Sequence, residues 1–141
     1  MNYSEIARDA SVSVDTARRY LEYLNLSYQV ILLQPYYKNI TSSVIKTPKL
    51  YWLDLGLLRQ LSGYRGEITG EIYETMVVGE LIKWMRTTQK DAEIYFYRTR
   101  SGLELDIILQ TETGIIGMEI KARRKISPTD IRPIKEIASK L

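Results

Sequence analysis

The stretch SGYRGEITG at residues 62–70 places three glycines within nine residues, near the middle of a chain of 141 residues. Glycine clusters of this kind mark loops, because they interrupt both helices and strands. The loop therefore divides the chain into two pieces, residues 1–61 and 62–141, and each is too short to build more than a thin core. We expect two small domains.

The first piece has the pattern of a winged helix. Residues 2–10 read as a short helix capped by Asn2 or Ser4, and residues 14–25 as a second helix capped by Ser13. The run SYQVILLQPYYKN that follows predicts a β-hairpin with its loop near Pro35. This arrangement is typical of DNA-binding modules, and also of modules that only pack against other domains. The expected buried face of the second helix consists of Val14, Ala17, Tyr20, Leu21 and Leu24, opposite Asp15, Arg18, Arg19 and Glu22.

A connector and a second pattern follow. The connector at residues 46–61 joins a strand-like run, KLYWLD, to a short helix, LGLLRQL. The second piece predicts a helix at 71–86, strands at 93–100, 103–110 and 114–122, and a closing helix at 127–141. Its element order is α-β-β-β-α, so the predicted fold class of the whole chain is α+β.

The composition excludes several classes of chemistry. The chain contains no histidine and no cysteine, which rules out Ser–His–Asp and Cys–His catalysis, thiol redox and His or Cys zinc sites. The net charge of +3 is compatible with a nucleic-acid partner. No apolar run approaches a membrane span, and no signal peptide opens the sequence, so we expect a cytoplasmic protein without a membrane partner.

Two of the predicted strands carry candidate metal ligands. The period of two places Asp106 with Glu104, Ile108 and Gln110 on one strand face, and Leu105, Ile107 and Leu109 on the other. In the next strand Glu119 and Lys121 share the face opposite Met118 and Ile120. If these strands pair, Asp106 and Glu119 can reach one cation, and oxygen ligands suit Mg²⁺ or Mn²⁺. Each carboxylate taken alone also fits a solvated surface.

The predicted helix at 71–86 offers a third carboxylate. At 100° per residue, Glu74 falls within the apolar stripe of Val78, Leu81 and Met85, whereas Glu80 falls about 120° away. A glutamate in a buried stripe is costly unless it is paired or binds a ligand. We therefore expect Glu74 to be the functional acid of this helix.

At this point the residues resemble a known superfamily. The run Gly70-Glu71-Ile72-Tyr73-Glu74, then Asp106, then Glu119-Ile120-Lys121 resembles the PD-(D/E)xK nucleases, whose restriction-endonuclease-like core has the order α-β-β-β-α-β. The wider chain, through KTPKLYWLDLGLL, GEIYETMVVGEL, YFYRTRSGLELDIIL and MEIKA, resembles the C-terminal region of a family of prokaryotic AAA+ ATPases. In that family an ATPase domain precedes a winged helix and a nuclease-like domain.

Two departures from that family pattern stand out. The sequence has no G-x-x-x-x-G-K-[ST] motif and no strand pattern after its last helix. We therefore expect a piece of a longer protein, without the ATPase domain and without the last strand of the nuclease core.

The resemblance implies roles for individual residues. Asp106 and Glu119 would hold Mg²⁺ or Mn²⁺, with the Ile120 carbonyl as a third ligand and Glu74 joining directly or through a water. Lys121 would position or activate the attacking water. The basic residues expected to contact DNA phosphates, or otherwise to form a solvated rim, are Arg18, Arg19, Arg98, Arg100, Arg123, Arg124 and Lys125.

Two functions stay open after this comparison. One is a Mg²⁺-dependent DNA endonuclease domain guided by a winged helix. The other is a nuclease fold that binds DNA or protein without catalysis. The expected partners are DNA, the missing ATPase domain and, as in many nucleases of this class, a second copy of the chain in a homo-oligomer.

Overall fold

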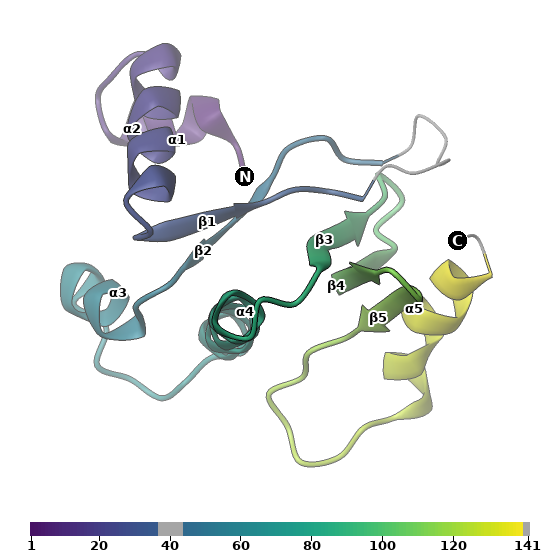
Figure 1. Cartoon of the computed structure of the whole chain (residues 1–141). Helices are drawn as coiled ribbons and strands as arrows, with labels where there is room; N and C mark the ends of the chain where they lie inside the picture. Colours follow the sequence, from purple (N-terminus) through teal and green to yellow (C-terminus); the bar gives the residue numbers. More distant parts are fainter. Residues whose placement is uncertain (37–43, 140–141) are drawn as a thin grey trace.

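The computed structural model describes residues 1–36 and 44–139. It is a mixed α+β structure of helices and two small antiparallel sheets, which confirms the predicted fold class (Figure 1). Within the described residues, no helix combines the length and the apolar character needed to cross a bilayer.

The chain begins with two short helices, α1 (Tyr3–Asp9) and α2 (Val14–Leu26). The side chain of Asn2 accepts hydrogen bonds from two backbone N–H groups at the start of α1, and that of Ser13 accepts from Thr16 at the start of α2. The Ser13 cap was predicted, and of the two candidates for the first cap, Asn2 and Ser4, the structure has Asn2, because capping depends only on neighbouring residues.

The buried face of α2 is narrower than predicted. Ala17 and Leu21 are buried as expected, but the Tyr20 side chain is 57% exposed and Val14 also lies at the surface. The physical reason is that α1 spans only seven residues, about 10 Å, and so covers only part of α2.

The strand after α2 pairs differently from the predicted hairpin. β1 (Val30–Leu33) pairs antiparallel with β2 (Lys49–Trp52), and Pro35 instead forms a parallel bridge to Phe96. Residues 37–39 of the expected hairpin lie outside the described residues. The distant pairing places Leu33 and Tyr51 in one core cluster. The short hairpin was therefore wrong, and the winged-helix assignment stays a prediction.

Two capped helices lead into the second half. α3 (Leu55–Ser62) is capped by the side chain of Asp54, and α4 (Gly70–Thr87) by that of Thr69. Both helices match the predicted segments.

The second half contains a three-stranded antiparallel sheet between two helices (Figure 1). Its strands are β3 (Ala92–Arg98), β4 (Glu104–Thr111) and β5 (Gly114–Met118), in the order β3-β4-β5. α4 covers one face, and α5 (Pro128–Ala138) covers the other. The α-β-β-β-α order was predicted correctly.

Each sheet face has its own apolar cluster. The cluster under α4 contains Leu33, Tyr51, Val78, Ile82, Phe96 and Ile107. The cluster under α5 contains Tyr36, Val44, Tyr97, Leu105, Ile108 and Ile137. The first cluster takes side chains from both halves of the chain, so β1 and β2 pack directly against the second half.

A β-bulge interrupts β4 at the centre of the sheet. Tyr95 pairs with Ile108 and Tyr97 pairs with Leu105, so two steps along β3 match three steps along β4. The extra residue sends Leu105 to the α5 face and Ile107 to the α4 face. The prediction that these two residues share a face was wrong, as was the placement of Ile108 on the face of Asp106, because strand alternation fails at a bulge.

The strand β5 ends earlier than predicted. Its pairing with β4 stops at Ile107↔Met118, beside the bulge. The Ile120 N–H then donates to the Asp106 carboxylate instead of to a strand backbone, at 2.8 Å. Glu119 and Lys121 therefore lie in the segment after the strand, and the predicted strand end at residue 122 was wrong.

The close approach of β5 to β4 predicts the effect of one substitution. A Cβ added at Gly117 would stand 2.9 Å from Cδ2 of Leu105, whose side chain is only 1% exposed. Gly117→Ala is expected to lower the free energy of unfolding by about 1–3 kcal/mol, measured by urea denaturation. Gly70→Ala is the matched control, because nothing lies within 4 Å of its added Cβ. An equal change in both variants would contradict the tight contact.

Candidate functional site

The centre of the candidate site is the ammonium group of Lys49, at the start of β2. Its Nζ lies 3.1 Å from Glu74 Oε1, 2.5 Å from Glu104 Oε1 and 3.7 Å from Asp106 Oδ1. The Lys49 side chain is only 18% exposed. Burial by itself lowers the pKa of Lys49, but the hydrogen bond to Glu104 and the charges of both glutamates outweigh it and raise the pKa. Lys49 therefore stays charged. We call these four side chains the Lys49 cluster.

Tyr51 fixes the orientation of Glu74. Its hydroxyl donates to Glu74 Oε1 at 2.5 Å, and the tyrosine is 4% exposed. Burial, followed by the hydrogen bond to Glu74, raises the pKa of Tyr51 well above its ordinary value. The hydroxyl thus acts as a donor. Lys49 and Tyr51 are two residues apart in β2, so both side chains reach the same face of the strand.

Asp106 is the most buried carboxylate of the cluster, with the residue 6% exposed. Burial raises its pKa to about 6, the hydrogen bond from Ile120 N–H opposes that rise, and the nearby charges of Glu74 and Glu119 add to it. The bulge in β4 directs Asp106 toward α4 and β2. Asp106 therefore carries out two tasks, holding the backbone after β5 and contacting Lys49.

Glu119 and Lys121 form a neighbouring pair. Lys121 Nζ lies 2.5 Å from Glu119 Oε1, and the Glu119 side chain is 12% exposed. Its other oxygen, Oε2, is buried without a hydrogen-bond partner among the described residues. Burial lowers the pKa of Lys121, but the hydrogen bond and the charge of Glu119 outweigh it, so the pKa is raised.

The structure brings only part of the predicted metal set together. Glu74 and Asp106 both contact Lys49, whereas Glu119 turns to Lys121. Across residues 1–36 and 44–139, no three Asp or Glu side chains are grouped so that they could hold a metal ion. A divalent ion therefore does not fit the site in this arrangement, because a lysine ammonium already lies among the carboxylates. The metal set implied by the resemblance stays a prediction.

The predicted phosphate-contacting residues fall into two groups. Three are engaged within the molecule: Arg18 lies 4.9 Å from the centre of the Tyr3 ring, Arg98 pairs with Glu104 at 3.4 Å, and Arg123 pairs with Asp130. The others are exposed: Arg19, Arg100, Arg124 and Lys125.

Sequence reasoning missed three residues of this site, namely Lys49, Tyr51 and Glu104. Period-two spacing in KLYWLD put Lys49 and Tyr51 on one face, and Glu104 was already placed on the face of Asp106. Those were the available signals. They pointed to shared faces without showing that β2 lies over the sheet.

Two family models divide the chain between them. Residues 69–141 match a family described as a domain of unknown function, DUF4143, and residues 1–67 match a second, DUF8612. Lys49 and Tyr51 lie in the region matched at residues 1–67, and the three carboxylates of the Lys49 cluster lie in the region matched at residues 69–141. The cluster thus joins the two matched regions.

Curated relatives exist in mycobacteria. Uncharacterized proteins of Mycobacterium bovis and Mycobacterium tuberculosis are each 32% identical over 125 residues, covering 84% of this chain. The matched part is 27% of each relative, so the chain spans about a quarter of their length. No solved structure matches the chain.

The Lys49 cluster predicts a large effect of removing its only cation. Lys49→Met is expected to lower the free energy of unfolding at neutral pH by about 3 kcal/mol, because Glu74 and Asp106 then lose their shared cation and Glu104 keeps only its pair with Arg98. The loss should shrink in acid. Lys83→Met is the control, since its pair with Glu80 is exposed at 52% and 68% and is worth about 0.5 kcal/mol or less. Urea denaturation compares the two, and similar losses would contradict the central role of Lys49.

The raised pKa of Asp106 predicts a pH dependence of stability. The folded pKa, about 6, lies above the ordinary value of 3.8, so the folded state binds this proton more tightly than the unfolded chain does. The contribution of Asp106 to stability therefore falls as the pH rises from about 4 to about 6. Asp106→Asn removes this fall and is expected to raise the free energy of unfolding at neutral pH by about 1–3 kcal/mol. Stability curves that run parallel for both proteins across this range would contradict the prediction.

Proposed function

The chain belongs to the family of the domain of unknown function DUF4143, and for it we propose a DNA-binding module. Its nuclease-like acid cluster is neutralised by the Lys49 ammonium group, which occupies the place of a metal ion. In this form it binds DNA without cleaving it. The observation that carries the proposal is the contact of one ammonium group with Glu74, Glu104 and Asp106.

Electrostatics explains why this contact opposes metal chemistry. A divalent ion that approached the three carboxylates would meet the Lys49 charge at nearly the same distance as its ligands. In a partly buried site that repulsion costs several kcal/mol. Metal binding would thus require the ammonium to withdraw, and Tyr51 would still hold one oxygen of Glu74.

The charge distribution supports DNA as the ligand. The chain has a net charge of +3 even though several acids are gathered inside. Arg100, Arg124 and Lys125 are exposed, and no ion pair between them and another described residue is present. Basic side chains that are free of internal partners can neutralise phosphates without reading sequence.

A second candidate, the Mg²⁺-dependent endonuclease, is favoured by one observation. Glu119 Oε2 is buried without a partner among the described residues, and Lys121 contacts the other oxygen of the same carboxylate. An unpaired buried carboxylate oxygen is costly unless a ligand completes it. This candidate requires a different position of Lys49.

Fluorescence anisotropy with a labelled duplex tests DNA binding. The double variant Arg124→Glu/Lys125→Glu is expected to bind about tenfold more weakly. The slope of the logarithm of the binding constant against the logarithm of the salt concentration should become shallower by about two, because two phosphate contacts are lost. Arg65→Glu/Lys83→Glu changes the net charge equally at sites outside the proposed surface, and should bind as the wild type does. No binding of duplex DNA by the wild type at low salt would overturn the proposal.

Metal titration separates the two candidates. The proposal expects no saturable binding of Mn²⁺ to the wild type by calorimetry, and an intact plasmid after incubation with Mg²⁺ or Mn²⁺. Cleavage that Lys121→Ala abolishes while DNA binding persists would establish the endonuclease instead.

A further inference from the structure

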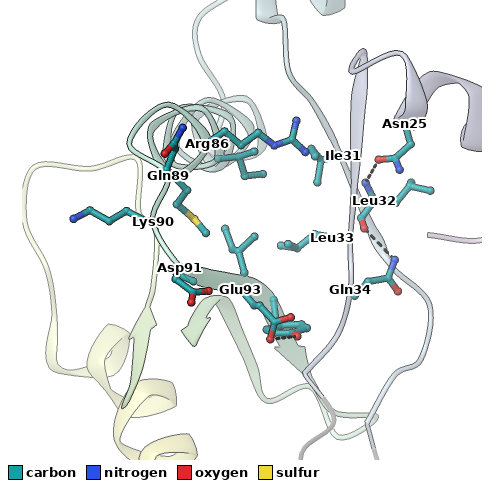
Figure 2. Close-up of a pocket in the computed structure, with 15 residues that line it drawn as sticks. Asn25, Ile31, Leu32, Leu33, Gln34, Arg86, Gln89, Lys90, Asp91 and Glu93 are labelled. Carbon is teal, nitrogen blue, oxygen red and sulfur yellow. Dashed lines mark hydrogen bonds between the residues drawn. The ribbon is translucent and has the colours of Figure 1, made fainter. Parts of the chain in front are cut away.

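A groove of about 740 Å³ lies between β1, the C-terminal end of α4 and the start of β3, and none of the four side chains of the Lys49 cluster lines it (Figure 2). Ile31, Leu33, Ile82, Met85 and Ile94 give it an apolar floor. The groove thus separates an edge of the two-stranded sheet from an edge of the three-stranded sheet.

The two edges meet at only one end of the groove. Phe96 N–H donates to Gln34 O at 3.1 Å, and Tyr36 N–H donates to Phe96 O at 2.8 Å, which is a parallel pairing of the two sheets. In the described part of the chain, this pairing stops at Phe96. Beyond that point the groove lies between Leu32 and Ile94.

Side-chain amides occupy the open edge of β1. Leu32 N–H donates to Asn25 Oδ1 at 3.2 Å, and Leu32 O accepts from Gln34 Nε2 at 3.1 Å (Figure 2). Leu32 and Gln34 are two residues apart, so their backbone groups point to the same side, away from β2 and toward β3. The two amides therefore supply the one acceptor and the one donor that a neighbouring strand would supply.

Charged side chains of both signs line the rim of the groove. Arg86 lies 4.7 Å from the centre of the Tyr28 ring, and Lys90 lies 5.9 Å from that of Trp84. Asp91 and Glu93 line the β3 side of the groove, are exposed, and form no ion pair with any described residue, although Glu93 accepts a hydrogen bond from the Tyr95 hydroxyl at 3.0 Å. The rim thus carries basic side chains at the end of α4 and acidic ones on the β3 side, and the acidic ones can pair with basic side chains of an incoming chain.

We propose that this groove binds an extended peptide of a partner protein, with alternating apolar and basic residues, by strand addition to β1. The peptide backbone replaces the amides of Asn25 and Gln34 on Leu32. Its apolar side chains contact Ile82 and Met85, and its basic side chains pair with Asp91 and Glu93. Strand addition takes affinity from main-chain hydrogen bonds and specificity from alternate side chains.

The test uses the full chain and a fluorescein-labelled peptide of alternating valine and lysine, with anisotropy as the readout. A matched peptide carries N-methyl groups on alternate residues, which removes the backbone donors and keeps the side chains. The proposal expects saturable binding of the first peptide and at least about tenfold weaker binding of the second, the factor expected for a lost hydrogen bond. Equal binding of both peptides, or binding of neither, overturns it.

Variants of the chain provide the second arm. Asp91→Lys/Glu93→Lys is expected to weaken binding about tenfold, and Glu67→Lys/Glu112→Lys, with the same charge change outside the groove, should leave it unchanged. Asn25→Ala/Gln34→Ala removes the competing amides and is expected to bind several-fold more tightly. Equal loss in both charge variants would show non-specific attraction and overturn the proposal. If the amide variant does not fold by circular dichroism, the N-methyl comparison on the wild type still decides.

Discussion

One partly buried ammonium group links the two halves of the chain electrostatically, beside the apolar cluster that they share. Lys49 comes from β2 in the first half, and it contacts three carboxylates carried by α4 and β4 in the second. Without that cation, burial of these acids side by side would be strongly unfavourable. The same contact joins the two regions matched by separate family models. The ammonium group that links the two halves thus also neutralises the acid cluster.

Two irregularities of the sheet place Asp106 in this network. The extra residue in β4 turns Asp106 and Ile107 toward the α4 side. The pairing of β5 with β4 stops beside this bulge, at Ile107↔Met118. Asp106 then accepts the Ile120 N–H that has lost a strand partner. β-Bulges commonly re-aim a side chain at a site. Here the bulge directs Asp106 to Lys49, while Glu119 contacts Lys121.

Much of the local structure could be predicted, and the failures share a cause. The caps at Asn2 and Ser13, the limits of α4 and the inward position of Glu74 follow from residues within one or two helical turns. The hairpin near Pro35, the faces of Leu105 and Ile107 and the end of β5 depend on which strand pairs with which, and there the predictions were wrong. Lys49 was missed because a lysine at a strand end is ordinarily a surface residue.

By itself, the sequence determined the α+β class, the element order of the second half, and a site chemistry restricted to carboxylates, lysines and tyrosines. Only the tertiary structure decided that Lys49 and Tyr51 lie over Glu74 and Asp106, and that Glu119 pairs with Lys121 instead. The reason is physical. Helix caps and side-chain periodicity depend on near neighbours, whereas the charge that neutralises a buried acid can come from any part of the chain that the packing brings to it.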